Sequence, residues 1–220
     1  MLRRPQRPLL FAALVTSAVA ALSLASVRYA QSDEAPSLPN GGIHKLLIDE
    51  DKIKAALEGA GWVSPNPKNE RFVYMVSFRS CPDCIRFEQE EFPKLAKGGL
   101  SPRVIVVTRR ARSTLPERSG SAELWAKRDW KTFETWTGMP VDAWTAAGLP
   151  NADTDPDRAA LVEKGRVLVE TLRPLLAENG VSFAYPTLIW KAADGHLEGC
   201  ACEARETYPF IRQKLGLAQD

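Results

Sequence analysis

The residues of this chain best suited to chemistry are two cysteines with the spacing Cys-x-x-Cys, Cys81 and Cys84. An apolar stretch at 72–78 precedes them and predicts a buried strand, and residues of helical composition follow from Ile85. A helix N-terminus presents free N–H groups and the positive end of the helix dipole, so it stabilises a thiolate. We expect Cys81 to be exposed in the first helical turn. Cys84 should lie one turn deeper on the same face, where the two can form a disulfide.

Two other interpretations of this cysteine pair are open. A Cys-x-x-Cys pair is also half of a four-thiolate zinc site, but such a site normally has a second pair with the same spacing. The other two cysteines of the chain, Cys200 and Cys202, have the spacing Cys-x-Cys instead. The first pair can also be buried and inert. Its position between a strand and a helix favours the redox interpretation.

Composition places the chain among ordinary globular proteins. Its 220 residues suffice for one domain with additions, and 45% hydrophobic and 25% charged residues are typical values. The formal net charge of +2 gives no signal for nucleic-acid binding. We therefore expect no nucleic-acid partner.

The N-terminus has the pattern of an export signal. Three arginines within the first seven residues form a basic region, and a mostly apolar stretch follows at 9–27. Small residues at Ser23 and Ala25 favour cleavage there, which makes 1–25 a signal peptide; an uncleaved membrane anchor at 9–27 is the alternative. Either outcome takes the rest of the chain out of the cytoplasm. We expect a periplasmic location, where cysteines are normally paired.

The rest of the chain reads as an extension followed by alternating strands and helices. Residues 26–70 combine a flexible linker with a short strand at 43–48 and a helix at 49–58. The Cys-x-x-Cys helix should kink or restart at Pro93. After it we expect, in order, a strand at 103–108, a helix at 121–136, a helix from Pro156 to 179–180 with Asp155 as N-cap, strands at 185–190 and 196–199, and a closing helix at 203–215.

A basic run at 109–112 follows the second strand of the core. It is either a solvated loop or a source of positive potential near the thiolate. The second interpretation is open because the carboxyl ends of parallel strands lie at the same edge of a sheet.

This order of elements resembles the thioredoxin superfamily, and more narrowly the catalytic domain of periplasmic Dsb-type proteins such as the DsbC/DsbG group. The resemblance covers about two thirds of the chain and rests on the residues at 77–84, 107–111, 122–127 and 180–187. It implies an α/β, thioredoxin-like domain over 71–217, with a central mixed sheet flanked by helices and a helical insertion at about 115–180. It also implies that Pro186 is cis and faces Cys81, and that Tyr185 pairs its backbone with an incoming peptide.

The chain departs from that pattern at three positions near the cysteines. Thioredoxins carry a tryptophan where this chain has Ser80, and they bury an acid where it has Met75, so the usual proton acceptor for Cys84 is missing. Asp83 places a negative charge beside the thiolate and should raise the pKa of Cys81. A less stable thiolate makes a less oxidising disulfide, which favours a reductase or isomerase over an oxidant. The dimerisation domain of the isomerases is absent or reduced to 31–70, which counts against isomerase activity.

The predicted fold brings Cys200 and Cys202 close to the first pair, because the last strand returns to the edge where Cys81 lies. Three interpretations are open for them. They form a structural disulfide or packed thiols, they are a second redox pair that exchanges electrons with Cys81, or they join the first pair in a copper or zinc site.

Together these features predict an exported thiol–disulfide oxidoreductase. Cys81 attacks the substrate sulfur, Cys84 resolves the mixed disulfide, and Tyr185 and Pro186 shape the peptide groove. The expected partners are cysteine-containing exported proteins and a redox partner protein, which can be membrane-bound. We expect no organic cofactor and no resident metal. The alternatives are a copper-binding, metallochaperone-like protein that uses all four cysteines and a non-catalytic binding module on the same scaffold.

Overall fold

The structure is a computed structural model that describes residues 42–218. The predicted signal peptide at 1–25, the alternative anchor at 9–27 and most of the predicted linker lie outside the described residues. Within residues 42–218, no helix has both the length and the apolar composition needed to cross a bilayer.

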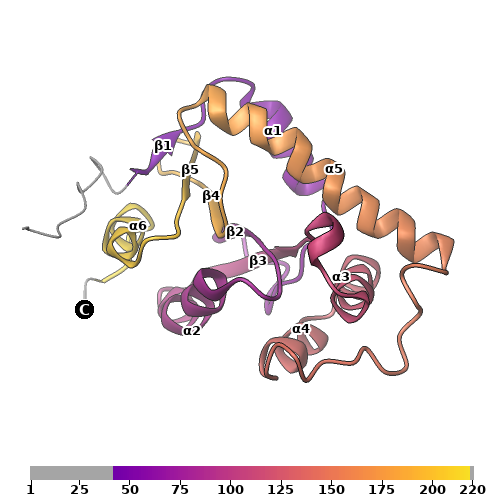
Figure 1. Cartoon of the computed structure of the whole chain (residues 1–220). Coiled ribbons are helices and arrows are strands. Elements are labelled where there is room, and N and C mark those ends of the chain that lie inside the picture. Colours follow the sequence, from indigo (N-terminus) through magenta and orange to yellow (C-terminus); the bar gives the residue numbers. More distant parts are fainter. Residues whose placement is uncertain (1–41, 219–220) are drawn as a thin grey trace, which may run out of the picture. The chain divides into compact units, whose positions relative to one another are not determined.

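A five-stranded mixed sheet forms the centre of the described chain, in the order β1-β5-β4-β2-β3 (Figure 1). The strands are β1 (His44–Lys45), β2 (Phe72–Ser77), β3 (Ser101–Val106), β4 (Thr187–Lys191) and β5 (Leu197–Ala201). Strands β2 and β3 are parallel, whereas β4 is antiparallel to both β2 and β5, and β1 is antiparallel to β5. Strand β2, which lies between β4 and β3, is mostly apolar and buried on both faces, as the sequence predicts.

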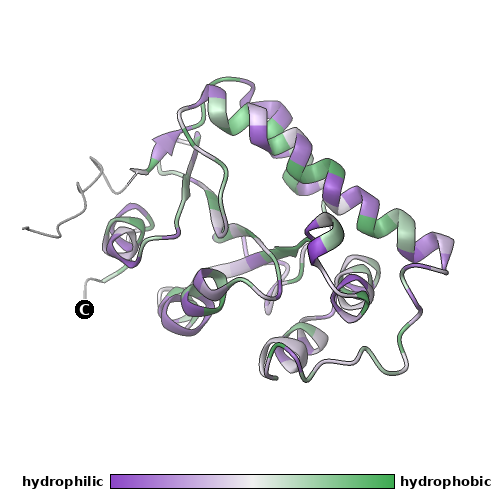
Figure 2. Ribbon diagram, in the orientation of Figure 1, coloured by the Kyte–Doolittle hydropathy of each residue, from purple (hydrophilic) through white to green (hydrophobic). Residues whose placement is uncertain are grey.

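Helices cover both faces of this sheet. One face carries α1 (Glu50–Glu58) and α5 (Pro156–Glu178), whose buried side chains form a cluster with Tyr74, Val76 and Ile189. The other face carries α2 (Pro82–Lys97) and α6 (Tyr208–Lys214), which pack with Met75 and Leu188. Figure 2 shows that the helices alternate apolar and hydrophilic residues along their length, as expected for elements that bury one side.

The helical insertion lies between β3 and β4. It consists of α3 (Leu115–Lys127), α4 (Trp130–Thr137) and α5. Helices α3 and α4 pack on β3 through a separate cluster that includes Val104, Leu124 and Trp136. A mixed sheet with the Cys-x-x-Cys helix after β2, a cis proline before β4 and a helical insertion is the thioredoxin-like fold that the sequence predicts, and this prediction is confirmed.

Two predicted helices differ from those observed. The prediction of a single helix at 121–136 is wrong, because this stretch is divided between α3 and α4. Helix α3 begins six residues earlier at a capping box formed by Thr114 and Glu117, and it ends at Arg128 in the left-handed conformation with φ 52°. Asp129 then caps α4 by accepting a hydrogen bond from the Thr132 N–H.

Helix α2 runs without a restart through Pro93 and ends at Gly98. Proline has no N–H, so the Gln89 carbonyl lacks its usual helical hydrogen bond from position 93. Both Gln89 and Pro93 are exposed. Water can therefore satisfy that carbonyl, and the helix tolerates the ring. Helix α5 begins as predicted, with Asp155 accepting hydrogen bonds from two N–H groups of the first turn.

The extension that precedes the core packs on the sheet. Strand β1 pairs with β5, and α1 lies beside α5 on the same face (Figure 1). Residues 42–58 therefore add one strand and one helix to the domain.

Candidate functional site

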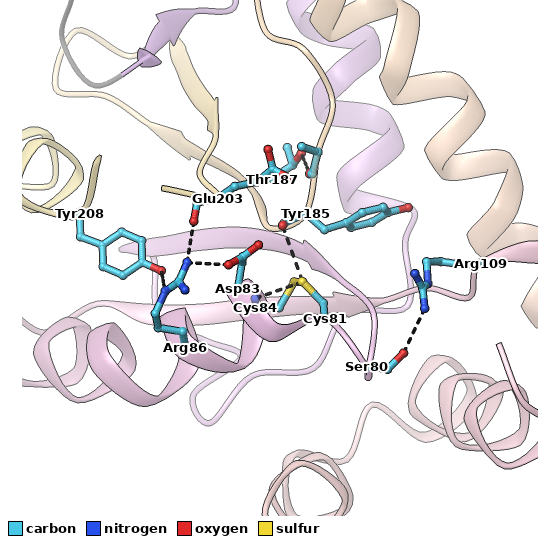
Figure 3. The surroundings of a disulfide bond; sticks show 11 residues. Ser80, Cys81, Asp83, Cys84, Arg86, Arg109, Tyr185, Thr187, Glu203 and Tyr208 are labelled. Atoms are coloured by element: carbon cyan, nitrogen blue, oxygen red, sulfur yellow. Dashed lines mark hydrogen bonds and ion pairs between the residues drawn. A yellow bond between two sulfur atoms is a disulfide. The ribbon is translucent and has the colours of Figure 1, made fainter. Parts of the chain in front are cut away.

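Strand β2 delivers the Cys-x-x-Cys motif to the N-terminus of α2. Cys81 is the N-cap residue of this helix, with Pro82 at the first helical position, where its missing N–H costs nothing. Cys81 and Cys84 form a disulfide with a Cα–Cα separation of 5.2 Å. The Cys84 N–H points at the Cys81 sulfur, with N and Sγ 3.1 Å apart (Figure 3). This N–H would stabilise a thiolate at Cys81 after reduction.

The loop before β4 lies beside this disulfide, because β4 neighbours β2 in the sheet. Cys81 Sγ lies 3.6 Å from the carbonyl oxygen of Tyr185, although the two residues are 104 positions apart in the sequence (Figure 3). The peptide bond between Tyr185 and Pro186 is cis. The structure therefore brings together four of the residues singled out from the sequence: Cys81, Cys84, Tyr185 and Pro186.

The expected exposure of Cys81 is wrong, because only 2% of this residue is accessible to solvent. The rings of Phe78 and Tyr185 meet edge to face at 4.9 Å and pack against the apolar cluster that contains Cys81. Both rings are half-buried, and Pro82 next to the sulfur is exposed. Two partly exposed aromatic side chains thus pack against the apolar cluster in which Cys81 is buried.

Arg109 places a positive charge near Cys81. Its guanidinium lies 3.9 Å from the centre of the Phe78 ring, and its Nη2 donates a hydrogen bond to Ser80 Oγ at 3.2 Å. Ser80 immediately precedes Cys81. Of the two interpretations of the basic run, the contacts of Arg109 favour positive potential near Cys81.

Asp83 does not act as an isolated negative charge. Arg86 Nη2 donates to Asp83 Oδ1 at 2.6 Å and to the backbone carbonyl of Glu203 at 2.7 Å (Figure 3). Arg86 also donates to the Tyr208 hydroxyl, and this hydrogen bond is the largest of the effects that hold the pKa of Arg86 above its ordinary value, with Asp83 acting in the same direction. Arg86 therefore compensates part of the negative charge that Asp83 places beside Cys81.

A second acid–base pair behind the motif was missed from the sequence. Glu88 and Arg79 line a small cavity together with Ser77, Phe133 and Trp136. Burial raises the pKa of Glu88 to about 7, although the charge of Arg79 opposes this shift. The Arg79 guanidinium is buried, and its Nη2 donates to the backbone carbonyl of Met139. The spacing is a signal that the sequence contains, since Glu88 is four residues after Cys84 and shares its helical face.

Cys200 and Cys202 form a second disulfide, with a Cα–Cα separation of 5.4 Å. Both residues are fully buried in the apolar cluster that also holds Cys81 and Cys84. The Cys202 N–H donates to the carbonyl oxygen of Pro186 at 2.8 Å, so the pair lies at the sheet edge that carries the first motif. Among residues 42–218, no group of three or more His, Cys, Asp or Glu side chains is arranged to hold a metal ion.

Comparison with known proteins finds only distant structural similarity. The chain matches no protein-family model and no curated protein. It is similar to a linker-deletion mutant of Proteus mirabilis ScsC, with 12% identity, a TM-score of 0.42, and coverage of 76% of this chain and 85% of that one. It is also similar to oxidised BdbD from Bacillus subtilis, with 16% identity, a TM-score of 0.44, and coverage of 73% and 92%.

A third similar structure is DsbA from Chlamydia trachomatis, with 16% identity, a TM-score of 0.34, and coverage of 59% of this chain and 78% of that one. Similarities at this level assign no activity to the chain. Its chemistry has to be argued from the geometry around Cys81.

Proposed function

We propose that this protein is a thiol–disulfide oxidoreductase that acts on cysteines of other proteins. The observation that carries the proposal is the position of the Cys81 sulfur. It lies at the N-terminus of α2, 3.1 Å from the Cys84 nitrogen and 3.6 Å from the carbonyl oxygen of Tyr185, which belongs to the cis peptide bond with Pro186. The helix end can hold a thiolate, and the cis loop offers backbone groups to an extended peptide.

In the reducing direction, the reaction begins with the Cys81–Cys84 pair as thiols. The Cys81 thiolate attacks one sulfur of a substrate disulfide, which breaks and releases the other substrate sulfur as a thiolate that takes up a proton. The Cys84 thiolate then attacks the Cys81 sulfur and closes the disulfide seen in the structure. The substrate leaves with two thiols, and two electrons have passed from the protein to it.

Tyr185 and Pro186 lie next to Cys81 and would determine substrate specificity. A substrate peptide that pairs with the loop before β4 would place its own cysteine over the Cys81 sulfur. Because only 2% of Cys81 is exposed, neighbouring groups must move before a substrate can reach its sulfur. Burial raises the pKa of the Tyr185 hydroxyl, so this side chain stays neutral at physiological pH.

We favour a reductase or isomerase over an oxidant. The Cys81 sulfur is buried among apolar side chains, and desolvation destabilises a thiolate. Asp83 adds a negative charge, although Arg86 compensates it. Arg109 and the helix N-terminus act in the opposite direction. A poorly stabilised thiolate corresponds to a reducing dithiol.

The export signal at 1–25, or the alternative anchor at 9–27, supports a periplasmic site of action. The substrates would then be exported proteins with cysteines. Because catalysis consumes the Cys81–Cys84 dithiol, a redox partner protein must regenerate it, and an inner-membrane protein can fill that role.

Insulin reduction by dithiothreitol tests the proposal. We expect the wild-type chain to accelerate precipitation of the insulin B chain. Cys81→Ser should return the rate to that of dithiothreitol alone. Cys84→Ser should be slower than wild type, because its mixed disulfide with insulin has to wait for dithiothreitol to cleave it. Val167→Ser, an exposed position on α5, serves as the control and should keep the wild-type rate. A wild-type chain that is inert in this assay would instead support a non-catalytic binding module.

A further inference from the structure

The two disulfides contact consecutive peptide units of one turn. The carbonyl oxygen of Tyr185 lies 3.6 Å from Cys81 Sγ, and the next carbonyl, that of Pro186, accepts the hydrogen bond from the Cys202 N–H at 2.8 Å. No intervening element separates the Cys-x-x-Cys motif from the Cys-x-Cys motif at this turn. The two pairs are neighbours in space although 116 positions separate Cys84 from Cys200.

Strand register places both pairs on the same face of the sheet. Cys200 in β5 pairs with Leu188 in β4, and Leu188 pairs with Met75 in β2. Directly opposed residues of a sheet point to one face, and these three belong to the cluster that includes Cys84 of α2. Cys202 follows Cys200 by two residues and belongs to this cluster as well.

Arg86 holds the two motifs together from a second direction. It lies in α2, two residues after Cys84, and its Nη2 donates to the carbonyl oxygen of Glu203, the residue immediately after Cys202 (Figure 3). We call Cys200 and Cys202 the inner pair, and Cys81 and Cys84 the outer pair. The segment that carries the inner pair is thus fixed by Pro186 on one side and by the Cys-x-x-Cys helix on the other.

Burial restricts what can reach the inner disulfide. Cys200 and Cys202 are both 0% exposed, so an external thiol has no direct route to them. Cys81 is 2% exposed, and it is the N-cap residue of α2, next to Pro82, which is exposed. Since the chain has four cysteines, the only other thiols of the protein that share the cluster with the inner pair are Cys81 and Cys84.

We infer that Cys200–Cys202 is a second, internal redox pair that exchanges electrons with Cys81–Cys84. This inference rests on the proposed function of Cys81. The Cys81 thiolate attacks one sulfur of the inner disulfide, whose S–S bond breaks and whose leaving thiolate takes up a proton. Cys84 then attacks the Cys81 sulfur, closes the outer disulfide and releases the second inner thiol. Two electrons and two protons move from the outer pair to the inner pair, which lets one molecule store two reducing equivalents in each pair.

A trapping experiment on the full chain tests this exchange. In Cys84→Ser, Cys81 lacks its resolving partner, so its attack on the inner pair should stop at a Cys81–Cys200 or Cys81–Cys202 disulfide, which N-ethylmaleimide fixes by blocking the released thiol. Trypsin would then release the peptide 80–86 linked to the peptide 192–205. Cys81→Ser/Cys84→Ser is the matched control and should give no linked peptide. Absence of the linked peptide from Cys84→Ser overturns the inference.

A rate measurement gives a second readout that needs no trapped intermediate. Dithiothreitol should reduce the inner disulfide of the native wild-type chain, and Cys81→Ala/Cys84→Ala should slow this step roughly tenfold or more, because reagent must then wait for local opening. Near-ultraviolet circular dichroism verifies that the double variant is folded. Equal rates in wild type and in the folded variant overturn the inference. If insulin reduction by wild type persists alongside that result, the proposed function stands without the internal exchange.

Discussion

Glu88 is the side chain whose chemistry is most altered by its surroundings. It lies on α2 one turn after Cys84, and burial raises the pKa of its carboxyl group to about 7. Thioredoxins bury an acid at the position that Met75 occupies here. Glu88 therefore offers a protonatable group near Cys84 from a different element. Its neighbour Arg79 has two guanidinium nitrogens, Nε and Nη1, that are buried without a hydrogen-bond partner among the described residues.

The Glu88 shift predicts a pH-dependent stability. The folded chain keeps a proton on Glu88 that the unfolded chain releases near pH 4.5, so the contribution of Glu88 to stability is greatest below pH 4.5 and falls as the pH rises to about 7. The loss amounts to at most about 3 kcal/mol, at 1.36 kcal/mol per pKa unit. Glu88→Gln removes this loss.

Urea unfolding at pH 4 and at pH 8 measures this effect. The free energy of unfolding of Glu88→Gln minus that of wild type should increase between the two pH values. Glu178→Gln, an exposed glutamate on α5, is the control for loss of a carboxylate. A difference between Glu88→Gln and wild type that is the same at both pH values would show that Glu88 is not the titrating group.

At the scale of elements, Arg86 connects the start of α2 to the segment after β5. It pairs with Asp83 on its own helix at 2.6 Å and binds the Glu203 carbonyl at 2.7 Å. The first contact sets the charge beside Cys81, and the second sets the position of α2 against the inner disulfide. Because Asp83 and Arg86 are each about one third exposed, solvent screens their pair and limits its effect.

Removal of the Arg86 charge should make the Cys81 thiolate less stable. In Arg86→Gln, Asp83 loses its ion pair, and its uncompensated charge should raise the pKa of the Cys81 thiol. The double variant Asp83→Asn/Arg86→Gln should return it toward the wild-type value. The pH dependence of alkylation of the reduced protein by iodoacetamide gives this pKa.

Arg205→Gln provides the matched control for the Arg86 variant. Arg205 lies in the segment after β5 that also contains Glu203, and it pairs with Glu90, further along α2. The variant should leave the pKa of the Cys81 thiol unchanged. If Arg86→Gln behaves like Arg205→Gln, the compensation of Asp83 by Arg86 has no bearing on the redox site.

At the scale of the whole molecule, the local signals in the sequence predicted most elements. The strand that precedes Cys81 and the helix capped by Asp155 lie where their residue types placed them. The break between α3 and α4 was missed, although Asp129 and Thr132 have the spacing of an N-cap. The pairing of Asp83 with Arg86 was equally readable, since the two are three residues apart on one helix.

Contacts between distant segments could not be predicted in the same way. Cys81 is buried in an apolar cluster against which Phe78 and Tyr185 pack, and no local pattern reports these contacts. The position of Cys202 against Pro186 needed the strand order first, because it follows from β5 lying beside β4. The types of residue at the site were thus predictable. Their packing, which decides which thiols can reach the Cys81 sulfur, was not.

Equilibration of the native chain with glutathione buffers tests the central claim most directly, with the redox state of the peptide 80–86 read by mass spectrometry. We predict that Cys81 and Cys84 are reduced and reoxidised reversibly without unfolding, at a potential closer to about −270 mV than to about −120 mV. A value near the second figure would contradict the reductive direction. A disulfide that stays closed until the protein unfolds would contradict the assignment of Cys81 as the attacking thiol.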